Sequence, residues 1–442
     1  MATTDTPLTI FVPDCVPLCN KGEEAIIRGI EDMLGAGHPC VEVAVFDNVK
    51  ETTRLGNITA FPDEWVYPMY SRKHGLFGSR VRWAWDLGKR MAGMSGTMGR
   101  IATSKDPLHR EMVEVFRRAD YVPVGHDGVF DLWSCALIHV ARKRGKRTGI
   151  LGAGVVGLGS RLFQYLYRKA VEESDFCTLR ERNAYEYMKS IGCEPTKMRL
   201  EPDPAFAMQP APAEQVRAFL DGQEWYARAR NRAKILVAVT VAHKEIILQR
   251  PFAEAAGPAE QGRLHTNYLA EVLDRVLAER DVFLVFLPHS IEPGPRNDLR
   301  AAQDVAAAMK SPPESRHVMT DDLRARAFKG IIADSDFLIG QRAHSLIGAA
   351  SVTTPYVALT ATNDLRTHDI LGEMCGCEKQ MVDMDLHTPE EAARKIVGAL
   401  DERDGIHAHL QEKMVELNAR LRGVAAWVSG ASGPPADDGE QR

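Results

Sequence analysis

Short apolar runs alternate with segments of helical periodicity through the first half of the chain. Two apolar runs of strand length, 8–13 and 41–46, enclose a segment whose apolar residues fall on one helical face, at 26, 27, 30, 33 and 34. Further runs continue the alternation at 121–124, 147–151 and 176–179. Strand, helix and strand in this order are typical of a doubly wound parallel sheet.

The second half repeats this pattern after a break. Residues 209–233 are rich in proline, alanine and charge, and we interpret them as a linker with a short helix. Apolar runs then return at 234–240, 282–287, around 318, 337–339 and 356–359. The chain is therefore predicted to be α/β, with two Rossmann-like βα domains, 1–208 and 234–428, in a GT-B-like arrangement. Such an arrangement has a ligand-binding cleft between the carboxyl ends of its two sheets.

Residues 63–105 interrupt the alternation of the first domain. Aromatic residues here, such as Tyr67 and Trp83, alternate with basic residues such as Arg72 and Arg82. One interpretation is a helical insertion that contacts a membrane surface, at its inner face, or a lipid-linked anionic substrate. The other is a solvated helix pair with aromatic anchors in the core. Residues 429–442 are rich in glycine, proline and aspartate and are predicted to be a disordered tail.

The main candidate for chemistry is the turn after the apolar run at 336–339. A helix of small residues is expected to begin there, so Arg342 and His344 should lie where a strand ends and a helix starts. The free N–H groups of a helix start favour an anion. Arginine adds a permanent charge on a planar fork of donors, and histidine adds a proton donor near neutral pH. A capped helix with a satisfied histidine is the alternative interpretation.

Similar turns follow other predicted strands, at the sheet edge where doubly wound folds bind ligands. They carry Asn20 and Gly22 after the first strand, Asp127 and Asp131 after the strand at 121–124, Arg180 and Arg182 after the strand at 176–179, and His289 after the strand at 282–287. Each also has a structural interpretation, such as an N-cap for Asp131, a turn cap for His289 and an acidic first helical turn around residues 20–24.

Composition narrows the function classes. A length of 442 residues suggests two or three domains, and a net charge of -5 gives no overall attraction to nucleic acid, so no nucleic-acid partner is expected.

We find no signal peptide and no apolar run of about 18 residues, and we interpret the eight cysteines as reduced thiols of a cytoplasmic protein. No histidine or aspartate cluster has metal-ligand spacing, so no metal is expected. The glycine-rich segment 152–159 lacks an acidic partner for a ribose and is interpreted as a tight turn.

An ordered set of motifs over most of residues 8–375 resembles the polysaccharide pyruvyl transferase family. Asn-Lys-Gly-Glu-Glu-Ala at 20–25 is similar to the family's Asn-x-Gly-Asp-Glu-Ala, and 125–131 is similar to its glycine-rich turn that ends in aspartate. The remaining matches are Leu-Arg-Glu-Arg-Asn at 179–183, Asp-Pro-Ala-Phe at 203–206, Leu-Pro-His at 287–289 and Arg-Ala-His at 342–344. The family adopts a GT-B-like fold, in agreement with the alternation of elements.

The resemblance implies transfer of the enolpyruvyl unit of phosphoenolpyruvate to two hydroxyls of a sugar, giving a cyclic pyruvate ketal and phosphate. The acceptor would be a polysaccharide or a lipid-linked oligosaccharide, and no cofactor is expected. Arg342, with Arg180 or Arg182, is the candidate cation for the donor, and Asn20 and Gly22 are further substrate-binding candidates.

Two proton transfers complete this implied reaction. The methylene carbon must be protonated, for which His344 is the first candidate and His289 the second. The attacking hydroxyl must lose a proton, for which Asp131 or Asp127 is the candidate. Closure of the two domains would shield the oxocarbenium-like centre from water.

The chain departs from the family's pattern at several positions. Glu23 stands where aspartate is usual, His126 and Asp127 interrupt the glycine-rich turn, and Arg366 stands near the place of a usual lysine, which makes it another substrate-binding candidate. Two other function classes therefore stay open. One is a GT-B glycosyltransferase that uses a nucleotide sugar, and the other is a non-catalytic binding protein on the same fold.

Overall fold

The computed structural model divides the chain into two compact units, each described here by itself. Unit 1 comprises Met1–Leu18, Ile30–Pro204 and Arg420–Arg442, and unit 2 comprises Cys19–Gly29 and Ala205–Ala419. The residues that the structure describes are 7–36, 38, 40–65, 103–125, 130, 132–155, 157, 159–231, 234–242, 252, 255, 257–291 and 297–434. Most of the predicted insertion at 63–105 and residues 435–442 of the predicted tail lie outside them.

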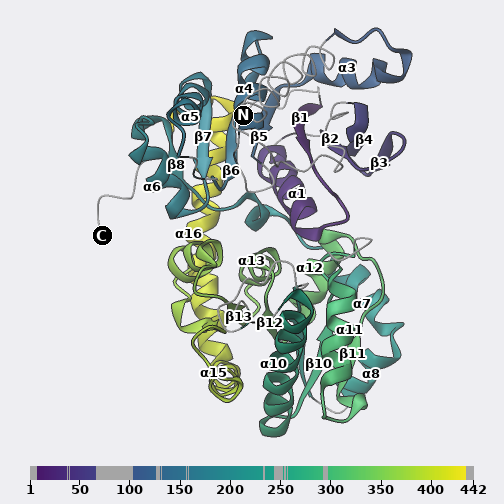
Figure 1. Cartoon of the computed structure of the whole chain (residues 1–442). Helices are drawn as coiled ribbons and strands as arrows, with labels where there is room; N and C mark the ends of the chain where they lie inside the picture. Colours follow the sequence, from purple (N-terminus) through teal and green to yellow (C-terminus); the bar gives the residue numbers. More distant parts are fainter. Residues whose placement is uncertain are drawn as a thin grey trace. The chain divides into compact units, whose positions relative to one another are not determined.

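Unit 1 is built on a parallel sheet in which one hairpin strand is antiparallel. Its strand order is β3-β4-β2-β1-β5-β6-β7-β8, and β3 pairs antiparallel with β4. The strands are β1 (Leu8–Cys15), β2 (Val41–Asp47), β3 (Thr53–Leu55), β4 (Ile58–Pro62), β5 (Tyr121–Val124), β6 (Arg147–Ala153), β7 (Phe176–Leu179) and β8 (Arg199–Leu200). Chain order runs outward from β1 through β5, β6, β7 and β8 on one side, and through β2 to the β3–β4 hairpin on the other. This is the doubly wound pattern expected from the sequence (Figure 1).

Helices of unit 1 bury one apolar face each against this sheet. They are α3 (Arg110–Arg118), α4 (Leu132–Lys143), α5 (Arg161–Glu173) and α6 (Arg182–Ser190). In α3 the buried residues are Met112, Val113, Val115 and Phe116, which is the spacing of one helical face. Phe116 packs edge-on against Phe11 of β1, with ring centroids 5.3 Å apart, so the helix is fixed to the central strand.

Unit 2 contains a fully parallel sheet with the order β11-β10-β9-β12-β13-β14. The strands are β9 (Ile235–Thr240), β10 (Val282–Phe286), β11 (Arg316–Val318), β12 (Phe337–Gly340), β13 (Tyr356–Thr360) and β14 (Met381–Asp383). The chain runs from β9 through β10 to β11, then returns to the other side of β9 as β12. The winding direction therefore reverses between β9 and β12, and loops at the carboxyl ends of such neighbouring strands leave room for a ligand.

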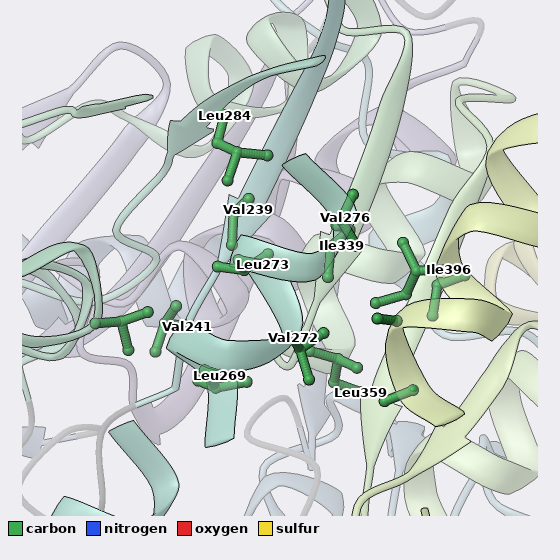
Figure 2. Close-up of a cluster of buried hydrophobic side chains, with 14 of the residues drawn as sticks. Val239, Val241, Leu269, Val272, Leu273, Val276, Leu284, Ile339, Leu359 and Ile396 are labelled. Atoms are coloured by element: carbon green, nitrogen blue, oxygen red, sulfur yellow. The ribbon is translucent and has the colours of Figure 1, made fainter. Parts of the chain in front are cut away.

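The core of unit 2 lies between this sheet and two of its helices. Figure 2 shows Val239 of β9 and Ile339 of β12 near Leu273 of α10 (Pro258–Glu279) and Ile396 of α15 (Pro389–Asp401). All four side chains are at most 2% exposed. α15 begins with a complete capping box, in which Thr388 and Glu391 satisfy each other's backbone N–H groups.

Two helices of unit 2, α7 (Ala213–Asp221) and α8 (Glu224–Asn231), lie in the segment predicted as a linker. Further helices of this unit are α11 (Asp298–Ala308), α12 (Ala325–Asp334), α13 (Ala343–Ser351) and α14 (Leu365–Thr367). Trp225 of α8 is 2% exposed and stacks on Phe283 of β10 and His317 of β11. Residues 209–233 therefore contribute to the core of unit 2, although a linker with one short helix was expected there.

Two helices contain residues of both units. α1 (Lys21–Gly35) has its first nine residues in unit 2, and α16 (Arg403–Ser429) has its last ten in unit 1. Among the described residues, no helix is long and apolar enough to cross a membrane.

Candidate anion-binding site

The turn between β12 and α13 carries Arg342 and His344, as the sequence predicted. Arg342 is the N-cap residue of α13, and His344 lies in the first turn. The Ser345 hydroxyl bonds to Thr240 at the end of β9 (2.8 Å) and to the Arg342 carbonyl (2.7 Å). A Cβ on Gly340 would lie 2.9 Å from Leu346 and 3.1 Å from Thr240, so a larger residue there would have to displace these side chains. The turn is thus fixed at the point where the winding of the sheet reverses.

Arg342 is oriented by a buried carboxylate. Its Nε donates to Asp298 Oδ2 at 2.9 Å and its Nη2 to Asp298 Oδ1 at 2.6 Å, a two-point pair. Asp298 opens α11, is 0% exposed, and also accepts the Ser290 backbone N–H at 3.0 Å. The pair therefore ties Arg342 to the segment that follows β10.

His289 follows β10 and is almost completely buried. Its ring packs edge-on against Phe328 of α12 (5.4 Å between centroids) and nearly parallel to the His344 ring (6.5 Å). Burial lowers the pKa of His289 well below its usual value, and electrostatic interactions with Arg342, His344 and Lys21 lower it further. His289 is therefore a neutral imidazole at neutral pH, and its Nδ1 has no hydrogen-bond partner among the described residues.

The first turn of α1 lies against both histidines. Asn20 forms a β-bridge with Ser290 and caps the helix through a 3.0 Å bond from the Gly22 N–H to its Oδ1. The Lys21 N–H donates to the His289 carbonyl at 3.2 Å. Asn20 and Gly22 were expected at the carboxyl end of the first strand of the N-terminal domain, and the structure places them in unit 2 with His289 and His344.

Glu24 anchors this first turn to a second helix. Its carboxylate is buried, accepts the N–H of Ala325 at the start of α12 (2.9 Å), and lies 3.2 Å from the Arg324 guanidinium. A carboxylate at a helix start is favourable because it satisfies a free N–H group and faces the positive end of the helix dipole. Glu24 thereby holds α1 beside the helix that carries Phe328.

Gly22 is the residue of this turn with the least space. A Cβ there would lie 2.5 Å from His344 Nδ1, 2.9 Å from His344 Cγ and 3.1 Å from His289 Cε1. We expect Gly22→Ala to weaken binding of the anion, because the added methyl group must displace the ring of His344. Overpacking should also cost roughly 1–3 kcal/mol of the free energy of unfolding. Calorimetric titration and urea unfolding measure the two effects.

The matched control for this substitution is Gly398→Ala in α15. Nothing lies within 4 Å of a Cβ at Gly398, and alanine in a helix interior is about 0.5–1 kcal/mol more favourable than glycine. The control should therefore bind the anion normally and gain stability. Unchanged binding in Gly22→Ala would contradict the contact between this glycine and the histidines.

The other predicted arginines have different surroundings. Arg180 of unit 1 is 0% exposed and pairs with Asp203, also 0% exposed, with Glu181 at 3.5 Å. Arg182 is exposed at the start of α6, in the same unit. Arg366 is partly buried in α14 of unit 2, beyond β13. Arg180 therefore lies in a buried ion pair, and its role as a substrate-binding residue stays a prediction.

The two predicted carboxylates lie outside the described residues. Asp127 and Asp131 follow Gly125, whose N–H donates to Asp14 Oδ2 at 3.1 Å. The base of the implied reaction thus stays a prediction. Among the described residues, no group of three histidine, cysteine, aspartate or glutamate side chains could hold a metal ion.

Three residues of this site were missed by the sequence analysis as site residues: Lys21, Glu24 and Asp298. Both Lys21 and Glu24 belong to the Asn-Lys-Gly-Glu-Glu-Ala motif at 20–25. An acidic first helical turn was enough to explain Glu24, and Lys21 stands at the variable position of the motif. Asp298 stands at a helix start, where an aspartate needs no further reason. Their roles depend on contacts with residues far away in the sequence, such as the 301 positions between Glu24 and Ala325.

Gln341 connects the anion site to a second buried histidine. Its Oε1 accepts the Ala242 N–H at 3.1 Å, so its amide NH₂ is left to donate to His265 Nε2, 3.0 Å away. This nitrogen must then be unprotonated. Burial lowers the pKa of His265 from 6.5 to about 4.

This lowered pKa predicts a loss of stability in acid. The unfolded chain binds a proton at His265 below about pH 6.5 and the folded chain only below about pH 4. The free energy of unfolding therefore has its full value above pH 6.5, and it decreases as the pH falls from 6.5 to 4. We expect His265 to account for a loss of about 3 kcal/mol across this window. Urea unfolding at several pH values measures it, and His265→Gln should show a correspondingly shallower dependence. An equal pH dependence in the variant would contradict the assignment.

Comparison with known proteins identifies a family and a fold. The family model for polysaccharide pyruvyl transferase matches residues 20–363, well over half of the chain. A comparison with curated proteins gave no match.

Among solved structures, the S. aureus MnaA protein in complex with UDP matches with a TM-score of 0.54 and 12% identity, over 98% of this chain and 100% of its own. A trehalose 6-phosphate synthase from Burkholderia multivorans matches with a TM-score of 0.51 and 12% identity, over 96% and 97%. At this identity the likeness shows the fold alone, and the predicted α/β, GT-B fold class is confirmed.

Proposed function

Because this chain belongs to the polysaccharide pyruvyl transferase family, a family of transferases, we propose that it transfers the pyruvyl group of phosphoenolpyruvate to hydroxyls of a sugar. The sugar would belong to a polysaccharide or to its precursor. The observation that carries this proposal is the cluster of Arg342, His344, His289 and Lys21 at the carboxyl edge of the unit 2 sheet. Such a cluster suits an anion with phosphate and carboxylate groups.

The reaction assigns separate tasks to these groups. Asp298 occupies Nε and one N–H of Nη2 of Arg342 and thereby fixes the side chain, so the N–H donors left on Nη1 and Nη2 are the ones that bind an anionic group of the donor. An acid adds a proton to the methylene carbon of phosphoenolpyruvate, and a sugar hydroxyl adds to the neighbouring carbon as it loses its own proton. The second hydroxyl then displaces phosphate and closes the ketal, and its proton leaves with the phosphate. Atoms and charge balance without a redox step.

His344 is the proposed acid because His289 is poorly suited to that task. A buried histidine whose pKa is held far below neutrality carries no extra proton to donate at pH 7. His344 is only partly buried and lies at the helix start beside Arg342. Asp131 or Asp127 remains the proposed base for the acceptor hydroxyl.

Ligand binding by the wild-type protein tests this function. We expect phosphoenolpyruvate to bind in a calorimetric titration and to raise the melting temperature by mass action. Glucose linked to uridine diphosphate serves as the comparison ligand. Binding of the sugar nucleotide without any binding of phosphoenolpyruvate would overturn the proposal in favour of a glycosyltransferase.

A further inference from the structure

Lys21 brings a second basic side chain to the candidate anion-binding site. Its side chain is 3% exposed, its backbone donates to the His289 carbonyl, and the next residue, Gly22, contacts His344. The ammonium group is near enough to His289 to contribute to the lowered pKa of that ring. Lys21 and Arg342 therefore act on the same ring from two different helix starts.

The two cations have counter-ions of different kinds. Asp298, the partner of Arg342, is completely buried and is held by the Ser290 N–H as well. Asp322, the partner of Lys21, has a side chain that is 59% exposed and lies in the segment between β11 and α12. An exposed carboxylate is already largely hydrated, so its release into water costs little free energy. The ion pair between Lys21 and Asp322 can therefore separate at little cost in free energy, whereas separating Arg342 from buried Asp298 is costly.

A buried polar atom beside these cations also points to a ligand. His289 Nδ1 is buried and lacks a hydrogen-bond partner among the residues described. Buried polar atoms nearly always have such a partner, and an oxygen of a bound ligand could supply it. The ring of His289 lies next to His344 and Gly22, which places this atom within the cluster.

We propose that Lys21 is a further substrate-binding residue that contacts a phosphate group, and that Asp322 is a counter-ion which the bound phosphate displaces. The identity of the ligand, phosphoenolpyruvate, rests on the proposed function. An ammonium is a compact point charge and suits a phosphate oxygen, whereas the fork of Arg342 suits the two oxygens of a carboxylate. Binding then exchanges one carboxylate partner of Lys21 for a phosphate.

This exchange predicts opposite effects for two single variants. Lys21→Met should raise the Kd of phosphoenolpyruvate by about 10- to 100-fold, the value of a hydrogen bond to a charged group. Asp322→Asn should lower the Kd by roughly two- to fivefold, because the competing partner loses its charge. Both are measured by calorimetric titration, with inorganic phosphate as a second probe that should show the same directions.

A matched control separates binding from folding. Lys329 of α12 is also buried in unit 2, at 2% exposure, and donates to the Met208 carbonyl. Lys329→Met removes a buried lysine away from the cluster, so it should lower the melting temperature and leave the Kd unchanged. Asp322→Asn changes a mostly exposed side chain and should fold normally.

The outcomes distinguish this inference from the proposed function. If the wild type binds no phosphoenolpyruvate, the proposed function fails and Lys21 loses its ligand. If the wild type binds but Lys21→Met binds equally well, or Asp322→Asn binds more weakly, the role of Lys21 fails while the function stands. A loss in Lys21→Met for phosphoenolpyruvate but not for inorganic phosphate would overturn the assignment to the phosphate group.

Discussion

Replacing Arg342 with methionine is expected to abolish measurable binding of phosphoenolpyruvate, with a loss of about 1,000-fold or more in affinity. The side chain supplies a charged, two-point hydrogen-bond donor, and each hydrogen bond to a charged group is worth about 1.5–3 kcal/mol. The substitution also leaves Asp298 buried without its cation. We therefore expect a loss of about 3–5 kcal/mol in the free energy of unfolding. Calorimetric titration and urea unfolding measure the two effects.

A second substitution separates the two effects of Arg342→Met. Adding Asp298→Asn removes the buried negative charge while its side chain can still accept the Ser290 N–H. The double variant should recover much of the lost stability and still fail to bind the donor. Recovery of binding in the double variant would show that Arg342 acts only through the fold, and the proposed role in binding would be abandoned.

Replacing Asp203 with alanine is expected to destabilise unit 1 by about 3–5 kcal/mol. The substitution removes the buried carboxylate that pairs with the Arg180 guanidinium, which is 0% exposed, and breaking a buried ion pair has a cost of this size. Glu181, 3.5 Å from Arg180, offsets part of that cost. The measurement is the midpoint of urea unfolding followed by a probe in unit 1.

An exposed ion pair in the same unit provides the control for Asp203→Ala. Lys169 and Glu172 of α5 are both about half exposed, so Glu172→Ala should leave the unfolding midpoint unchanged. Phosphoenolpyruvate binding at 25 °C should persist in Asp203→Ala if Arg180 is purely structural. A folded Asp203→Ala protein that no longer binds the donor would return Arg180 to the list of substrate-binding residues.

The regular elements of the fold could be predicted closely because their signals are local. β5 and β7 have the predicted bounds, 121–124 and 176–179, since each is a short apolar run. The segment at 209–233 was harder because its two helices are short, at nine and eight residues. Trp225 is buried only because β10 and β11 offer Phe283 and His317 for stacking. That partner surface is formed by residues about 60–90 positions later, which no local pattern reports.

The candidate site could be predicted only where its signals are local in the sequence. Arg342 and His344 were placed by a strand-to-helix turn, which is local. The unit in which Asn20 and Gly22 lie was not predictable from the turn around them, because it depends on His289, His344 and Ala325. Arg180 was an equally good candidate by sequence. Both arginines pair with a buried aspartate, and the Arg180 side chain is 0% exposed whereas that of Arg342 is 12% exposed.

The anchoring of the first turn of α1 has a consequence for the order of events during synthesis. Glu24 leaves the ribosome early, but its partners Arg324 and Ala325 follow some 300 residues later. Before these partners are synthesised, the Glu24 carboxylate cannot make these contacts. The two histidines next to Gly22, His289 and His344, have not been synthesised at that stage either. The anion site therefore matures only after most of the protein has been translated. Loop closure over such a distance is slow, so we expect donor binding to appear as one of the last steps of refolding.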